Sequence, residues 1–459
     1  MHRHGPQPNV VEAIRRDLAN SREWIGRLVV LAYAAAAGGS IVGFTWLSDR
    51  ALGAFAHLVA AQPLLPLAWT PLLCMLLAWI TVQWVPGAAG SGIPQVMAAL
   101  HTSVPETERH GLVSLRLAFA KIALTAGGLL GGLPIGREGP SVQIAAGVMH
   151  HARRWLPQGG SVTPHGLLVA GGAAGIAAAF NAPLAGVMFA IEELTRKIEQ
   201  RSSGLVVAAI VLAGLVSVSV FGNATYFGVI HVPMLHWSFA GPALLVTLGS
   251  GLLGGLFSRL LQASLMGTSH PIMRWRAAHP VVFSGLCGLG VAVIGIASGG
   301  ATFGSGYQTT RQLVEGHAQM PGLYVTLRLA ATWLAVWSGV PGGLFAPSLA
   351  IGAGFGNDIA VLTGAGPESV ALIALGMAGF LAALTQAPVT AFIIVMEMVD
   401  GHAMVLTLMA ASLGASLVAR WLARPLYGAL ASAQLAGMDP GRHPREPHPV
   451  AGGAPQATP

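Results

Sequence analysis

The sequence predicts an all-α protein that crosses a lipid bilayer several times. Of its 459 residues, 54% are apolar and only 9% are charged, against about 25% charged in a typical soluble domain. The charges are also clustered, so that residues 51–105, 202–258 and 277–310 contain no Asp, Glu, Lys or Arg. Because a spanning helix needs about 20 mostly apolar residues, the longest of these stretches have room for two passes each.

The glycine and proline content indicates that the spanning helices are interrupted. The chain contains 61 Gly and 29 Pro. Glycine allows helices to pack closely, and proline interrupts them. Such irregular backbone is tolerated at membrane depth only where it is buried in protein or lines a polar pathway. We therefore expect broken and re-entrant helices.

Charge and cysteine content exclude several other functions. The net charge of +7 is spread over loops and termini without a dense basic patch, which indicates membrane orientation and headgroup contact rather than nucleic-acid binding. The two cysteines, Cys74 and Cys287, lie in apolar stretches and are expected to be buried thiols. No CxxC spacing suggests a metal site, and we expect no cofactor.

The two ends of the chain are predicted to lie outside the bilayer. Residues 1–27 include a mixed-charge segment (Val10–Arg27) that predicts an amphipathic helix at the membrane surface rather than a signal peptide, followed by a first span over Leu28–Ser48. Its arginine excess favours a cytoplasmic N-terminus. The polar tail, residues 434–459, is too short for a folded regulatory domain and is expected to be disordered.

An internal repeat connects the two halves of the chain. Residues 180–192 align with 385–397, so that the Ala-Pro pairs coincide and both segments end in Glu, at Glu192 and Glu397. Upstream, 138–144 aligns with 345–351 at nearly the same offset. Two motifs in one order favour duplication over chance similarity between Ala/Gly-rich helices. We place the halves at 28–230 and 231–433, and a transport site at their interface.

Three Gly-x-x-x-Pro elements share one design. They are Gly90-Ser-Gly-Ile-Pro94, Gly136-Arg-Glu-Gly-Pro140 and Gly343-Leu-Phe-Ala-Pro347, and each proline opens an apolar run. Proline suits the first position of a helix, where its missing N–H would be unsatisfied anyway. Each element therefore predicts a glycine-rich loop that leads into a helix N-terminus inside the membrane. Free N–H groups and the positive ends of helix dipoles would then converge on one anion.

These elements resemble the three anion-pathway signatures of the CLC chloride channels and transporters. The run from Ala182-Pro-Leu-Ala-Gly186 to Glu193 and the late Arg424-Pro-Leu-Tyr427 are similar to the same family. The resemblance extends from the first apolar helix to about Leu430. It implies the CLC-type fold, with an inverted internal repeat and broken, re-entrant helices.

The resemblance also assigns roles to individual residues. Glu138 would be the gating glutamate, which occupies an anion site when ionised and leaves it when protonated. Glu193 would be the internal proton acceptor that distinguishes exchangers from channels. Lys121 matches a lysine on the helix that leads into the second signature. The anion site implied by the resemblance comprises Ser91, Gly92, Ile93, Leu344, Phe345 and Tyr427, with hydroxyls from Ser91 and Tyr427 and N–H groups from the helix starts.

Some of these residues have a plainer interpretation. Glu138 could be an interfacial carboxylate beside Arg137, and Glu193 could be neutralised by Arg196 or Lys197. Because Glu192 pairs with Glu397 in the repeat, we assign those two a shared structural role and leave Glu193 as the functional carboxylate.

Three further positions have a structural alternative. Lys121 could serve function, snorkel to the interface or make a structural hydrogen bond. Tyr427 could belong to an interfacial aromatic belt. His150 and His151 are expected in a loop, not in a metal site, because adjacent residues on a helix point apart.

The expected function is chloride transport as a proton-coupled H+/Cl− antiporter. The alternative within the family is an uncoupled chloride channel, and the remote alternative is an intramembrane enzyme. Neither Ser91 nor Ser305 fits the Gly-x-Ser-Gly pattern of an intramembrane serine protease, so we expect no enzyme. The resemblance implies a compact prokaryotic form without paired nucleotide-sensing domains and a homodimer with one pathway per subunit. We expect a multi-pass protein of the inner (plasma) membrane, with both termini cytoplasmic and with chloride, protons and lipid as its partners.

Overall fold

The computed structural model describes residues 21–157, 162–195, 203–222, 227, 239–267, 270–316 and 322–438. Over these ranges the chain is helical, and its β-type pairing is limited to an isolated bridge between Gly136 and Gly343. Seven of the described helices are long and apolar enough to cross a membrane, and three more are apolar but shorter. The predicted all-α membrane fold with broken helices is therefore confirmed.

The helices fall into two consecutive series. The first series comprises α2 (Ser21–Ala61), α3 (Pro66–Trp84), α4 (Ile93–Leu100), α5 (Glu106–Arg109), α6 (Leu115–Leu130), α7 (Glu138–His151), α8 (Pro164–Phe180), α9 (Pro183–Phe189) and α10 (Ser203–Phe221). The second series comprises α11 (Ala240–Met266), α12 (Pro271–Ala278), α13 (Pro280–Ala297), α14 (Tyr307–Val314), α15 (Tyr324–Trp337), α16 (Phe345–Thr363), α17 (Ser369–Thr385), α18 (Pro388–Met398), α19 (Val405–Arg420) and α20 (Leu426–Met438).

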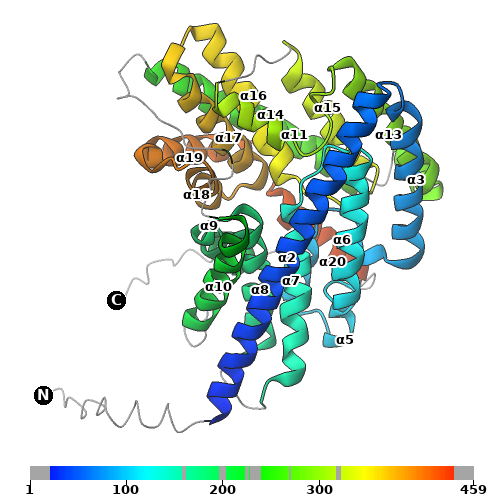
Figure 1. Ribbon diagram of the computed structural model, residues 1–459, viewed down its shortest axis with the longest axis vertical. Coiled ribbons are helices and arrows are strands. Elements are labelled where there is room, and N and C mark those ends of the chain that lie inside the picture. The colour runs from blue at the N-terminus through cyan, green and yellow to red at the C-terminus, as the bar shows by residue number, and fades with distance from the viewer. Residues whose placement is uncertain are drawn as a thin grey trace, which may run out of the picture.

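Helix α2 is longer than the sequence suggested. It runs without a break for 41 residues, whereas we expected a surface helix followed by a separate span over Leu28–Ser48. The segment contains no proline, so nothing stops the helix at either expected boundary. At 1.5 Å per residue it is about 60 Å long, roughly twice the hydrocarbon thickness, and it runs obliquely along the molecule (Figure 1). Residues 1–20 lie outside the described ranges.

The two series repeat one packing arrangement. Helix α7 packs along α8, and α10 packs against both α2 and α8; in the second series α16 packs along α17, and α19 packs against both α11 and α17. Equivalent helices also meet each other, α3 against α13 and α9 against α18. This is the packing of two halves related by a two-fold axis, as the repeat predicts. The division that we placed between residues 230 and 231 lies outside the described residues.

Both halves interrupt their helices in the same way. Helix α8 ends at Asn181 and α17 ends at Gln386, two residues in the left-handed conformation with φ of 56° and 60°. Each side-chain amide donates a hydrogen bond to a backbone carbonyl, of Gly222 (3.2 Å) and of Ala423 (2.7 Å) respectively. An Ala-Pro pair then opens α9 or α18. The breaks that the sequence repeat indicated are thus confirmed.

Two expectations about local structure were wrong. His150 and His151 end helix α7 rather than lie in a loop, and their rings contact His110 and Tyr33, each with centroids 6.1 Å apart. Neither residue is a helix breaker, and helix α7 continues through both to the 3-10 turn at Ala152–Trp155. The last helix, α20, continues to Met438, past the expected start of the tail at residue 434; its Ala- and Leu-rich sequence favours helix. The buried positions of Cys74 and Cys287 are confirmed.

Candidate functional site

The starts of α7 and α16 meet at the centre of the repeat. Gly136 and Gly343 exchange two backbone hydrogen bonds, each with an N–O distance of 2.7 Å. Each glycine lies two residues before a helix start, at Glu138 and Phe345. Pro140 and Pro347 occupy the third helical position rather than the first, which we had expected. They still fall in the first turn, where backbone N–H groups have no partner within the helix.

Glu138 extends from one half to the other. Its side chain is fully buried, and Oε2 accepts a hydrogen bond from the backbone N–H of Ala346 in the first turn of α16 (3.4 Å). Oε1 has no hydrogen-bond partner among the described residues. A side chain at Gly136 would collide with Oε2, so this glycine leaves the space that the carboxylate occupies. The first turn of α16 is therefore a binding place for a negative charge.

Lys121 holds the loop before α4. This lysine lies in α6 and is fully buried, and its Nζ donates to the carbonyls of Ala88 and Gly90 at 2.7 Å each. Gly90 and Gly92 take φ values of 68° and 106°, which favour glycine. Of the three interpretations offered by the sequence, the structural hydrogen bond is the one present. It fixes the backbone on which Ser91 sits.

Ser91 lies against the start of α7. Its hydroxyl is buried and has no hydrogen-bond partner within the described part of the chain. A side chain at Gly139 would collide with this hydroxyl, and one at Gly92 would collide with the carbonyl of Gly139. The glycine after Glu138 thus permits α4 and α7 to approach at their N-terminal ends. Ile93, the first residue of α4, is fully buried at the same place.

Tyr427 brings α20 to this group of helix starts. It is fully buried, and its ring lies edge-on to that of Phe345, with centroids 5.9 Å apart. Its hydroxyl lies close to that of Ser91, but neither hydroxyl forms a well-aligned hydrogen bond with a described residue. The belt-aromatic alternative is therefore wrong. Leu344 and Phe345 are also buried here, so the structure brings all six residues of the expected anion site to one region.

Glu192 and Glu397 have equivalent structural roles. The carboxylate of Glu192 accepts hydrogen bonds from the N–H groups of Val389 (3.1 Å) and Thr390 (2.7 Å) at the start of α18. The carboxylate of Glu397 accepts from Leu184 (3.2 Å) and Ala185 (2.7 Å) at the start of α9. In both helices these are the two residues after the first-position proline. Each half thus caps a helix of the other half, and the predicted structural pair is confirmed.

Glu193 directly follows the capping residue Glu192 in the chain. It lies half-buried in a single π-helical turn, Ala190–Thr195. Tyr427 lies within electrostatic reach of both Glu193 and Glu138. Arg196 and Lys197, the alternative partners of Glu193, lie outside the described residues. The adjacent Glu192 is fully engaged in capping, so the two neighbouring glutamates differ in their surroundings.

Arg328 is a second buried cation that the sequence reasoning missed. It lies in α15, is fully buried, and donates to the carbonyls of Thr302 and Gly304 at 2.8 Å each. It precedes Phe345 by the same number of positions as Lys121 precedes Glu138. The loop that it holds, Gly304-Ser-Gly306, is therefore the counterpart of Gly90-Ser-Gly92. Extending the repeat alignment upstream of residue 138 at the same offset would have found the cation.

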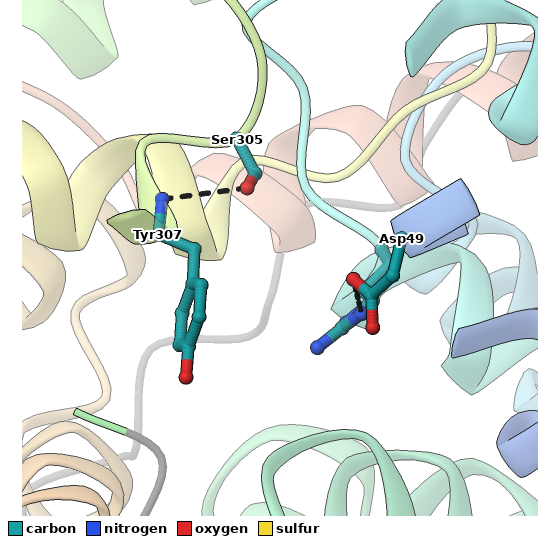
Figure 2. A network of polar contacts seen from close by, with 4 residues as sticks. Asp49, Ser305 and Tyr307 are labelled. Atoms are coloured by element: carbon teal, nitrogen blue, oxygen red, sulfur yellow. Dashed lines mark hydrogen bonds and ion pairs between the residues drawn. The ribbon is translucent and has the colours of Figure 1, made fainter. Parts of the chain in front are cut away.

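A cavity of about 690 Å³ leads to Glu138. One wall is the part of α2 around Ser48 and Asp49, and another is the loop that begins α14, from Gly304 to Tyr307. Asp49 and Tyr307 face the same opening (Figure 2). Asp49 forms an ion pair with Arg137, the residue before Glu138, with an Oδ1–Nη1 distance of 2.7 Å. The buried carboxylate thus lines a cavity that also contains the Asp49–Arg137 ion pair.

Comparisons with known proteins identify the family to which the chain belongs. The family model described as "Voltage gated chloride channel" matches residues 73–420. The chain belongs to this family, the CLC family.

Solved CLC structures share the fold. A slow cyanobacterial Cl−/H+ antiporter is 24% identical, with a TM-score of 0.75 over 90% of this chain and 99% of that chain. A eukaryotic CLC transporter is 22% identical, with a TM-score of 0.71 over 90% of this chain and 75% of that one. A CLC-type fluoride/proton antiporter is 20% identical, with a TM-score of 0.71 over 88% and 97%.

Membership of the CLC family decides the coarse function. This CLC protein is a multi-pass membrane protein of chloride transport and not an enzyme. The intramembrane-enzyme alternative is thereby removed.

Proposed function

We propose that this CLC protein exchanges chloride for protons and that Glu138 carries the coupling. The observation that supports this most directly is the position of the Glu138 carboxylate. It is fully buried, lines the cavity and is bound through Oε2 to the first turn of α16. Backbone N–H groups at a helix start favour any anion. The carboxylate therefore occupies a place that chloride can take.

Protonation of Glu138 would exchange the two anions. A neutral carboxyl group loses the attraction of the helix starts, so the side chain can leave and chloride can enter. The absence of a side chain at Gly136 provides the space that the carboxylate occupies before it leaves. One group would then link proton binding to anion passage.

The chloride ion would bind among the buried hydroxyls of Ser91 and Tyr427. Buried hydroxyl groups are nearly always hydrogen-bonded, and chloride supplies the acceptor that the described residues do not. The N–H groups of the helix starts complete the proposed site, from Gly92, Ile93, Leu344 and Phe345. The site holds a partly dehydrated anion without a cation that would bind it too tightly.

Glu193 is the proposed internal proton acceptor. It differs from Glu192, whose carboxylate is committed to the start of α18. Tyr427 lies within electrostatic reach of both proposed proton carriers, Glu193 and Glu138. The proton pathway and the chloride pathway would therefore both pass through Glu138 and would separate near Tyr427.

The cellular setting is part of the same proposal. The protein would act as a homodimer in the inner (plasma) membrane, with one pathway per subunit and both termini in the cytoplasm. Residues 28–230 and 231–433 would be the two repeated halves. Under this orientation the cavity at the C-terminal half of α2 opens to the outside.

Paired flux measurements test the exchange. Purified protein is reconstituted into liposomes, a chloride gradient is imposed, and chloride and pH are recorded together. We expect the parent protein to drive protons against their gradient, and Glu193→Gln to keep chloride flux but lose proton movement. If the parent moves chloride without protons, the uncoupled channel is the correct function.

A further inference from the structure

The cavity outside Glu138 contains a charge arrangement that the proposed exchange does not use. Four charged residues line it: Asp49, Arg137, Glu138 and Arg311. Arg311 is bonded to Glu315 on its own helix, with an Nε–Oε1 distance of 2.7 Å. Arg137 is bonded across the cavity wall to Asp49 on α2. When both carboxylates are ionised, the two negative and two positive charges of the described lining residues sum to zero.

The Arg137 guanidinium is an anion-binding group in a protected position. Its side chain is only 12% exposed, whereas that of Asp49 is 58% exposed. Arg137 is the N-cap residue of α7, so its charge adds to the positive end of that helix. A guanidinium has five N–H donors and binds small anions strongly. The Oδ1 atom of Asp49, 2.7 Å from Nη1 of Arg137, therefore occupies a position in which another anion could bind.

Two buried hydroxyls line the cavity beside this ion pair. Thr45 and Ser48 precede Asp49 on α2, and Thr45 lies one helical turn before it, on the same face. Both side chains are more than nine-tenths buried, and neither hydroxyl has a hydrogen-bond partner among the residues that the structure describes. Buried hydroxyls without partners call for a ligand or water. These groups are independent of Glu138 and of the helix starts.

We propose that Arg137, Thr45 and Ser48 form a second station for a small monovalent anion and that Asp49 competes for it. The proposal rests on the exchange function, because it extends the same anion path outward. Asp49 would act at this station as Glu138 acts at the inner one, as a carboxylate that holds the place between passages. An anion entering the cavity would displace two carboxylates in series. Because Asp49 competes for the guanidinium, Arg137 would not hold the anion too tightly to release it.

Chloride binding by the purified protein in detergent tests the station directly. Isothermal titration calorimetry is carried out on the parent, Asp49→Ala, Glu138→Gln and the double variant. Removing Asp49 should tighten chloride binding about two- to fivefold, since a half-exposed ion pair is weak. The same change should occur in the Glu138→Gln background. Adding Arg137→Gln to Asp49→Ala should remove the gain.

A matched control separates this effect from the loss of any surface carboxylate. Glu106 is paired with Arg153, and the exposed fractions of the pair (57% and 19%) resemble those of Asp49 and Arg137. Neither residue lines the cavity, so Glu106→Ala should leave chloride binding unchanged. If Asp49→Ala does not fold, Asp49→Asn removes the charge with the same shape and should show a smaller gain.

The possible results are distinct. Unchanged chloride affinity in Asp49→Ala or Asp49→Asn overturns the station, as does a gain that disappears when Glu138 is Gln, because Asp49 would then act through Glu138. A gain shared by Glu106→Ala also overturns it, as a general charge effect. Failure of proton coupling in the parent would instead count against the exchange function and leave the binding result intact.

Discussion

The starts of α7 and α16 have the same backbone arrangement but differ in the residue that begins each helix. They are joined through Gly136 and Gly343, and each is preceded by a buried cation that holds two loop carbonyls, Lys121 in one half and Arg328 in the other. Yet α7 begins with Glu138 and α16 begins with Phe345. The scaffold is thus symmetric, and the differences between the halves fall at the residues proposed to carry function.

The same contrast holds for two other positions. Glu192 and Glu397 are equivalent and both cap helices, whereas the counterpart of Glu193 is Met398. Ser91 has a counterpart in Ser305, but the two hydroxyls differ in their hydrogen bonding. The Ser305 hydroxyl accepts from the N–H of Tyr307 at 3.4 Å, while that of Ser91 has no partner among the described residues. The two serines are thus equivalent in sequence but differ in hydrogen bonding, and anion binding is proposed for Ser91 alone.

The largest expected effect is the loss of coupling at the asymmetric helix start. Glu138→Ala should keep chloride flux, lose most of its pH dependence and reduce uphill proton movement to background, because the proton carrier is gone. Paired chloride and proton fluxes from liposomes over a range of pH measure this. Phe345→Leu is the control at the equivalent position and should retain coupling. A Glu138→Ala protein that still moves protons uphill would contradict the proposed gate.

The two buried cations should contribute equally to stability. Lys121→Met and Arg328→Met should each lower the free energy of unfolding by about 2–4 kcal/mol, since each leaves two buried carbonyls unpaired. Denaturant unfolding in detergent measures the change. Thr125→Val, one turn after Lys121, should have little effect, because its hydroxyl bonds to no described residue. A loss of stability in only one of the two methionine variants would show that Lys121 and Arg328 do not have equivalent roles.

The reciprocal caps should show a smaller and matched effect. Glu192→Ala and Glu397→Ala should each cost about 0.5–2 kcal/mol, the range for lost helix caps. Glu192→Gln should still couple protons to chloride, unlike Glu193→Gln, when both are assayed in liposomes. Loss of coupling in Glu192→Gln with unchanged stability would reverse the assignment of these neighbours.

The smallest expected effect concerns the paired serines. Ser91→Ala should change the chloride-to-nitrate preference about two- to tenfold, as expected for one neutral hydrogen bond. Ser305→Ala should leave it unchanged, since that hydroxyl is used within its own loop. Flux ratios in the two anions measure the preference. Equal shifts in both variants would remove Ser91 from the anion site.

The sequence predicted the broken helices, the meeting of the three Gly-x-x-x-Pro elements and the role of Glu192 and Glu397, because these depend on local chain chemistry and on the repeat. It did not predict Arg328 or the pairing of Asp49 with Arg137. The ion pair joins residues 88 positions apart, which no local pattern records, whereas Arg328 could be found only by extending the repeat alignment. The length of α2 was also missed, because a helix ends where packing or a breaker stops it, not where hydropathy falls.

The reciprocal caps have a consequence for how such a chain arose and is made. A single half would expose the start of α9 with two N–H groups lacking their acceptor, and the acceptor comes from Glu397 in the other half. During synthesis the first half is therefore incomplete until the second has entered the membrane. An ancestral half-length chain would have met the same need by capping a second copy of itself. With both halves in one chain, each of the two helix starts always has its acceptor.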